Sequence, residues 1–110
     1  MKRTRTYSPY AVEAAQLLGA QVRLARRERR WSVQELADRA GITPFTLSKV
    51  ERGDLTVGLG VAFEVAALVG VPLFHEDRSR LRIDTERARD RLALLPQRVR
   101  ARKQGVKDDF

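Results

Sequence analysis

Apolar residues recur at three- and four-residue steps through the first third of the chain, which predicts an amphipathic helix. The stripe consists of Val12, Ala15, Leu18, Val22 and Ala25. Ser8 and Pro9 precede the stripe as an N-cap and a first helical residue, positions that these residue types favour. Because Gly19 is a poor helix former within the stripe, we expect the stable part of this helix to begin only after it.

The next predicted helix starts at a well-defined cap. Ser32 and Glu35 have the spacing of a capping box, in which each side chain bonds the other residue's free backbone N–H. Trp31 and Leu36 lie on either side of this cap with the spacing of a hydrophobic staple. Gly41 then ends the helix, because glycine readily adopts the left-handed conformation that follows a helix.

A third helix, Pro44–Arg52, is predicted from Thr43 as its N-cap and Gly53 as its end. It is separated from the preceding helix, Ser32–Ala40, by only the three residues 41–43. Two short helices joined by such a turn, with glycine at its start, have the spacing of a helix-turn-helix motif.

The long apolar run Val57–Phe74 predicts a fourth helix over Leu59–Val69. Its apolar residues occupy most faces of the helix, which indicates a buried, central position. Glu64 lies near its middle and Gly70-Val71-Pro72 ends it early, so we expect a buried helix and no membrane span.

Asp77 is positioned to cap a fifth helix, which ends before Pro96 and alternates arginine with acidic residues around an apolar stripe. The stripe consists of Leu81, Ala88, Leu92 and Leu95. Such a stripe serves either core packing or a dimer interface. Leu92, Leu94 and Leu95 together exceed what one narrow face requires, which favours a two-fold interface. Residues 97–110 contain little to bury and predict a flexible tail.

The 110 residues suffice for one domain, and their formal net charge is +8. The positive excess lies in residues 1–30 and 96–110, whereas residues 31–74 are slightly acidic. Such basic flanks favour a polyanionic partner, with nucleic acid as the first candidate. The chain has no cysteine and one histidine, and it lacks a nucleophile–base pair or phosphate loop, so we expect no enzyme, metal site or cofactor. A cytoplasmic protein fits this composition.

The motif residues continue into a longer pattern: Gln34-Glu35-Leu36-Ala37-x-x-Ala40-Gly41-Ile42-x-x-x-Thr46-Leu47-Ser48-Lys49-Val50-Glu51-Arg52-Gly53. Within Val22–Pro72, this pattern resembles the Xre-type, lambda-repressor-like helix-turn-helix domain. The resemblance implies an all-α, five-helix domain that binds double-stranded DNA, commonly as a homodimer on a palindromic operator. The expected divisions are a basic arm at 1–10, the DNA-binding domain at 11–74, a C-terminal helix at 75–95 with a possible role in dimerisation, and a flexible basic tail at 96–110.

The flanking segments are similar to HipB-type antitoxins. The segments that carry this similarity are Gly53–Gly60, Ala62–Leu68, Val71–Phe74, Arg91–Pro96, Arg98–Arg100 and Val106–Phe110. The similarity implies a protein that represses its own operon and binds a HipA-type Ser/Thr kinase toxin. The alternative is a solitary Xre-type regulator without a toxin partner.

The Xre resemblance also implies roles for individual residues, because the second helix of the motif enters the major groove. Residues expected to face bases are Pro44, Phe45 and Lys49. Residues expected along the DNA backbone are Ser32, Val33, Thr43, Thr46 and Arg52. The N-terminal arm would reach DNA through Lys2, Arg3 and Arg5.

The first residues of the helix expected to enter the major groove depart from the family's pattern. In the family, amide or charged side chains are frequent at positions 44 and 45. Neither Pro44 nor Phe45 can make a bidentate hydrogen bond to a purine. Phe45 could instead pack on a thymine methyl, and Lys49 could donate to guanine. We therefore expect few base-specific contacts from this helix, with DNA shape and the N-terminal arm also contributing to sequence specificity.

Several of these residues have a structural alternative. Lys49 could be a solvated helix residue, and Phe45 could belong to the core or to a dimer contact. Arg23, Arg27 and Arg30 could form either a solvated face or a grip on phosphate. Arg26 and Glu51 match a family pair that joins the first helix to the recognition helix, which indicates a structural role. Phe110, at the chain end, is either part of a solubilising tail or an anchor in a partner's pocket.

Overall fold

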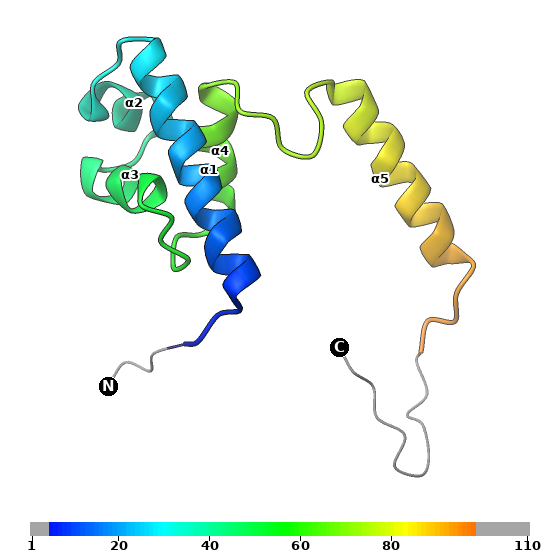
Figure 1. Ribbon diagram of the computed structural model, residues 1–110. Coiled ribbons are helices and arrows are strands. Elements are labelled where there is room, and N and C mark those ends of the chain that lie inside the picture. Colours follow the sequence, from blue (N-terminus) through cyan, green and yellow to red (C-terminus); the bar gives the residue numbers. More distant parts are fainter. Residues whose placement is uncertain (1–4, 99–110) are drawn as a thin grey trace. The chain divides into compact units, whose positions relative to one another are not determined.

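The computed structural model describes residues 5–98, and this part of the chain is helical. Its five helices are α1 (Pro9–Glu28), α2 (Val33–Ala40), α3 (Pro44–Glu51), α4 (Leu59–Leu68) and α5 (Arg78–Ala93) (Figure 1). The residues described contain no strand beyond an isolated bridge between Leu73 and His75. The all-α class expected from the sequence is confirmed. The predicted helices α2, α3 and α4 are each one residue shorter, because Ser32, Arg52 and Val69 are caps.

Helix α1 is continuous through Gly19, so the expectation that the stable helix begins only after this glycine was wrong. Gly19 is buried, and a Cβ built there would lie 2.6 Å from the backbone carbonyl oxygens of both Val50 and Glu51. The glycine therefore allows α1 to approach the end of α3 closely. The predicted cap is confirmed, because Ser8 Oγ accepts a hydrogen bond from the Ala11 N–H at 3.2 Å.

The capping box of α2 is present in full. The Glu35 N–H donates to Ser32 Oγ at 3.1 Å, and the Ser32 N–H donates to Glu35 Oε1 at 2.8 Å. Gly41 ends α2 in the left-handed conformation with φ 70°, which glycine adopts without steric cost. Trp31 lies partly buried against the core at the start of this element, as expected for the staple. The turn between α2 and α3 thus has the predicted helix-turn-helix geometry.

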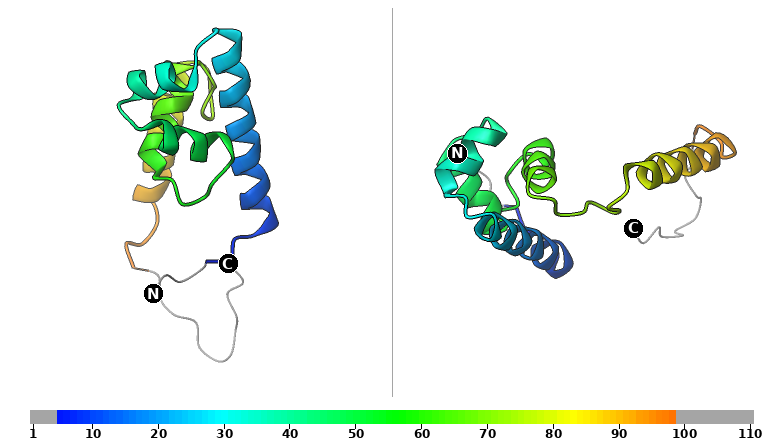
Figure 2. Two further views of the ribbon diagram at one scale, coloured as in Figure 1. Left: turned by 90° about the vertical axis from the view of Figure 1, so that its left-hand side faces the viewer. Right: turned by 90° about the horizontal axis from the view of Figure 1, so that it is seen from above.

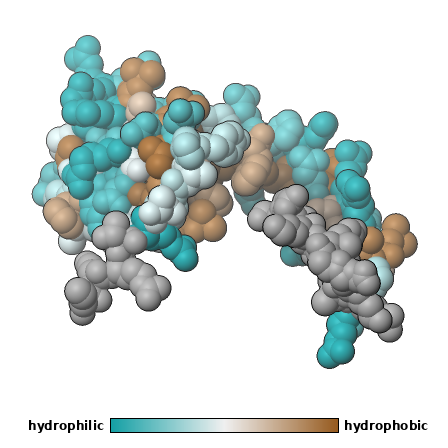
Figure 3. Space-filling model, turned by 60° about the horizontal axis from the view of Figure 1, so that its bottom comes forward, coloured by the Kyte–Doolittle hydropathy of each residue, from teal (hydrophilic) through white to brown (hydrophobic). Residues whose placement is uncertain are grey.

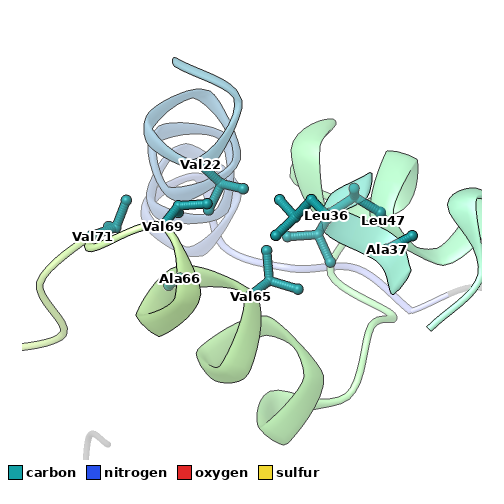
Figure 4. Packing of buried hydrophobic residues seen from close by; sticks show 9 residues of the cluster. Val22, Leu36, Ala37, Leu47, Val65, Ala66, Val69 and Val71 are labelled. Atoms are coloured by element: carbon teal, nitrogen blue, oxygen red, sulfur yellow. The ribbon is translucent and has the colours of Figure 1, made fainter. Parts of the chain in front are cut away.

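Helices α1 to α4 enclose one hydrophobic core, in which α1 packs on α3 and α4 while α2 packs on α3 and α4 (Figure 2). The fully or nearly buried apolar residues are Val22, Leu36, Ala37, Leu47, Val50, Val65, Ala66, Val69 and Val71 (Figure 4). Helix α4 contributes Val65 and Ala66, but Leu59 at its start is 68% exposed. The prediction of a buried fourth helix therefore holds only for its inner face.

The chain divides after Glu76 into two compact units, and α5 belongs to the second. Asp77 caps α5, as predicted, by accepting a hydrogen bond from the Ser79 N–H at 2.9 Å. No residue of α5 is buried, and Leu92 is 67% exposed. No helix within residues 5–98 is both long and apolar enough to cross a membrane.

Candidate nucleic-acid interface

Helix α3 has one face fixed in the core and the opposite face free. Leu47 and Val50 are buried beneath α1 and α2. Residues turn by about 100° each along a helix, so the side opposite this pair carries Phe45, Lys49 and Arg52. Phe45 is 70% exposed, and the Lys49 Nζ lies 5.7 Å from the centroid of the Phe45 ring. These side chains form an outer face of α3 that combines an aromatic ring with two positive charges.

The N-terminus of α3 is held by two threonines whose hydroxyls bond each other. Thr43 Oγ1 accepts the Thr46 N–H at 3.1 Å and donates to Thr46 Oγ1 at 3.0 Å. Because each hydroxyl can donate or accept, this bond uses one of the two hydroxyl protons and leaves the other for an external acceptor such as a phosphate oxygen. Pro44 is half-buried at this end and offers no N–H.

The N-terminus of α2 presents Ser32 and Val33, the residues expected near phosphate. The capping box uses the Ser32 N–H internally, and hydrogen bonds from Ser32, the backbone one first, lower the pKa of the Glu35 carboxyl. The Ser32 hydroxyl accepts the Glu35 N–H, so it too serves the capping box. Val33 is half-buried against the core, so it can present only its backbone N–H to an anion.

Arginines of α1 meet these two helices around a surface hollow of about 400 Å³. Its lining residues are Arg23, Arg26, Arg27, Val33, Ser48, Glu51 and Arg52. Sequence reasoning left Arg23, Arg27 and Arg30 undecided between a solvated face and a phosphate grip. The structure brings Arg23 and Arg27 to the start of α2 and the end of α3, whereas Arg30 lies outside this lining. Ser48, which sequence reasoning did not single out, also belongs to the hollow.

A buried ion pair fixes α3 against α1. The Arg26 guanidinium donates to both carboxylate oxygens of Glu51, from Nε at 2.7 Å and from Nη2 at 3.1 Å. Its Nη1 donates to the Trp31 carbonyl oxygen at 2.8 Å, and hydrogen bonding to Glu51 raises the pKa of Arg26. The predicted structural pair is confirmed. Among residues 5–98, this is the one ion pair within 4 Å, and it leaves the hollow with the positive charges of Arg23, Arg27 and Arg52.

The expected N-terminal arm lies only partly within the described residues. Arg5 is exposed, with its guanidinium carbon 5.9 Å from the centroid of the Tyr7 ring. Lys2 and Arg3 lie outside the described residues, as does Phe110, which was expected to contact a partner.

A helix-turn-helix held on a small helical core, with a positive, exposed outer face on its second helix, defines a class of DNA-binding proteins. Comparison with protein families supports this class, because a family described as a helix-turn-helix domain matches residues 17–81, more than half of the chain. The chain belongs to this helix-turn-helix domain family, and its fold is lambda-repressor-like. No curated protein matches the chain.

Proposed function

We propose that the protein is a sequence-specific DNA-binding transcription regulator that inserts α3 into the major groove. The observation that carries this proposal is the outer face of α3, where Phe45 and Lys49 are held away from the core by the buried Leu47 and Val50. The Arg26–Glu51 pair holds this helix in a fixed orientation on α1. A rigidly mounted recognition helix is what direct contact with base edges requires.

Within this proposal, Lys49 donates to guanine and Phe45 packs on a thymine methyl, while Pro44 borders the groove. Backbone contacts come from Ser32, Val33, Thr43, Thr46 and Arg52, and the bonded hydroxyls of Thr43 and Thr46 keep one proton between them for phosphate. The positive hollow adds Arg23 and Arg27 to this set. Lys2, Arg3 and Arg5 of the arm contact DNA beside the main site. We propose neither catalysis nor a cofactor for the protein.

Replacing Lys49 with alanine is expected to weaken binding to the DNA upstream of the protein's own gene by about 5- to 150-fold, the range for one specific base contact. The loss on random DNA should be much smaller, because random sequences offer no matched guanine. Fluorescence anisotropy at one fixed salt concentration measures both affinities.

The matched control is Arg87→Ala, which removes one exposed positive charge from α5, outside the helix-turn-helix unit. It is expected to change both affinities only slightly, by the same factor. If Lys49→Ala lowers both affinities equally, Lys49 contacts phosphate and not a base. If neither affinity changes, the proposed docking of α3 is wrong.

We further propose that this regulator is a cytoplasmic, homodimeric antitoxin, which represses its own operon from a palindromic operator and neutralises a HipA-type Ser/Thr kinase toxin. The support is the resemblance of Gly53–Gly60 and of Arg91–Pro96 to HipB-type antitoxins. The helix-turn-helix family alone is equally compatible with a solitary Xre-type regulator.

A pull-down from nuclease-treated lysate of the native host distinguishes these two alternatives. The full chain is expected to retain a kinase stoichiometrically, and a chain that ends at Pro96 is expected to lose it if the segment that includes Phe110 anchors the toxin. If neither chain retains a partner, although both bind the upstream DNA, the protein is a solitary regulator instead.

A further inference from the structure

The outer face of α3 joins an exposed aromatic ring to a positive charge. Apolar side chains lie among hydrophilic ones over the face of the molecule shown in Figure 3. What distinguishes Phe45 from other exposed apolar residues is that the Lys49 Nζ lies over its ring, 5.7 Å from the centroid. A ring face attracts a cation within about 6 Å. The two side chains therefore interact in the protein without DNA.

The two carboxylates that follow Lys49 closely in the chain are engaged by other groups. Glu51 belongs to the buried ion pair, and Asp54 Oδ1 accepts the N–H of Thr56 at 2.8 Å and its hydroxyl at 2.6 Å. Within the described part of the chain, Lys49 has no ion pair within 4 Å. The Phe45 ring is therefore the group that holds the ammonium in place.

Holding the ammonium in place matters because a lysine side chain loses much rotamer freedom when its end is fixed. Phe45 lies four residues earlier on the same helix face, and its contact with Lys49 restricts that freedom before DNA binds. Less freedom is then lost on binding, which strengthens the contact with DNA. An ammonium has three N–H donors, so it can rest on the ring and still donate to guanine N7 or O6.

The distance between the ring and the ammonium limits which bases the two can meet. Stacked base pairs lie about 3.4 Å apart, so the 5.7 Å between Phe45 and Lys49 is shorter than two steps along DNA. Guanine and thymine do not pair with each other in the duplex, so the contacts of the proposed function fall on neighbouring base pairs. The two side chains thus select a base step and not two independent bases.

The chemistry of Phe45 limits what it can recognise in its base pair. A phenyl ring has no hydrogen-bond donor or acceptor, and the apolar group that a base presents in the major groove is the C5 methyl of thymine. The base 5-methylcytosine carries the same methyl and differs from thymine there in its hydrogen-bonding group. Phe45 is therefore suited to recognise the methyl in either base.

We propose that Phe45 positions Lys49, so that the two side chains together recognise a guanine next to a pyrimidine with a C5 methyl. This inference rests on the proposed insertion of α3 into the major groove, and it names the base step that α3 contacts there. Thymine supplies the methyl in unmodified DNA. Cytosine methylation supplies it in modified DNA, so binding depends on methylation where a cytosine occupies this position.

Modified bases in the upstream DNA test the guanine contact by fluorescence anisotropy. The base 7-deazaguanine lacks the N7 acceptor, and we replace the guanines by it one at a time. Binding by the unmodified chain is expected to weaken about 5-fold or more at the guanine that Lys49 contacts. Lys49→Ala identifies this guanine, because the variant is expected to be insensitive to the replacement there.

Uracil in place of thymine tests the methyl contact, because the two bases differ only by the C5 methyl. At the base pair next to the identified guanine, uracil is expected to weaken binding on the order of threefold, the effect of one buried methyl group. At the same position, 5-methylcytosine is expected to bind more tightly than cytosine by a similar factor. Uracil at a thymine outside the binding site is the control and is expected to have no effect.

Two replacements of Phe45 test its effect on Lys49. Phe45→Leu removes the ring but keeps an apolar side chain, whereas Phe45→Tyr keeps the ring; Phe45 is 70% exposed, so both variants are expected to fold. Phe45→Leu is expected to respond to 7-deazaguanine by less than about twofold although Lys49 is present, and Phe45→Tyr is expected to keep the full response. A purely structural role of Phe45 would weaken binding to normal and modified DNA by the same factor.

Equal responses to 7-deazaguanine in Phe45→Leu and in the unmodified chain would overturn the positioning role. Unchanged binding with uracil beside the guanine, or equal binding of cytosine and 5-methylcytosine, would overturn recognition of the methyl. Both outcomes leave sequence-specific binding intact. An unmodified chain that binds the upstream DNA no better than random DNA would instead overturn the proposed function, and this inference with it.

Discussion

Replacing Glu51 with alanine is expected to destabilise the helix-turn-helix unit by about 3–5 kcal/mol, the usual cost of removing one partner from a buried ion pair. The side chains of Glu51 and Arg26 are each only 7% exposed, so the guanidinium left behind would be buried without its counter-charge. It would keep only the hydrogen bond from Nη1 to the Trp31 carbonyl oxygen. Because small domains are stable by about 5–15 kcal/mol in total, this loss is large.

Thermal denaturation followed by circular dichroism measures the effect, which corresponds to a fall in Tm on the order of 15 °C or more. Glu64→Ala is the matched control, because Glu64 is an exposed carboxylate on α4. Exposed substitutions of this kind change stability by less than about 0.5 kcal/mol. A Glu51→Ala variant as stable as Glu64→Ala would show that the ion pair does not hold α3 on α1.

The double replacement Arg26→Met with Glu51→Leu identifies the cause of the loss. It removes the buried charge together with its partner, and apolar replacements of buried ion pairs are often neutral or stabilising. Most of the lost stability is therefore expected to return. If the double variant is as unstable as Glu51→Ala, the cost arises from packing of the side chains and not from an orphaned charge.

Local signals predicted most of the helix-turn-helix unit. The capping box of Ser32 and Glu35, the cap at Thr43 and the glycine at 41 each act within a few residues of chain, so their spacing in the sequence is sufficient to locate them. The Arg26–Glu51 pair spans 25 residues and was accessible only through the family resemblance. Its geometry in the structure gives that resemblance a physical basis, since it fixes the angle between α1 and α3.

The features that sequence reasoning missed depend on contacts between distant segments. The hollow that gathers Arg23 and Arg27 with Arg52 exists because α1 lies across the start of α2 and the end of α3. The spacing of Arg23 and Arg27 indicated a shared helix face, but not what that face meets. The hydrogen bond between the hydroxyls of Thr43 and Thr46 likewise required the folded turn.

Gly19 shows most directly why helix propensity alone was misleading. Propensity assigns a cost to glycine within a helix, and on that basis the stable part of α1 was expected to begin after it. In the structure, the backbone of α1 at Gly19 lies directly against the backbone carbonyl oxygens of Val50 and Glu51 at the end of α3. A residue with any side chain would hold α1 and α3 apart, so the local penalty is outweighed by packing.

Replacing Gly19 with alanine is therefore expected to destabilise the protein by about 1–3 kcal/mol, the usual cost of overpacking. The added Cβ would lie 2.6 Å from two backbone carbonyl oxygens, which flexible side-chain motion cannot relieve. This direction is opposite to the ordinary effect of glycine-to-alanine replacement in a helix, which stabilises by about 1 kcal/mol. Denaturant unfolding monitored through Trp31 fluorescence measures the difference.

Gly60→Ala in α4 is the matched control, because no atom lies within 4 Å of the Cβ that would be added there. It is expected to be neutral or to stabilise the protein by less than about 1 kcal/mol. The two variants make the same chemical change in two helices, so opposite signs isolate the contact between α1 and α3. A stability gain for Gly19→Ala would show that α1 does not approach the end of α3 this closely.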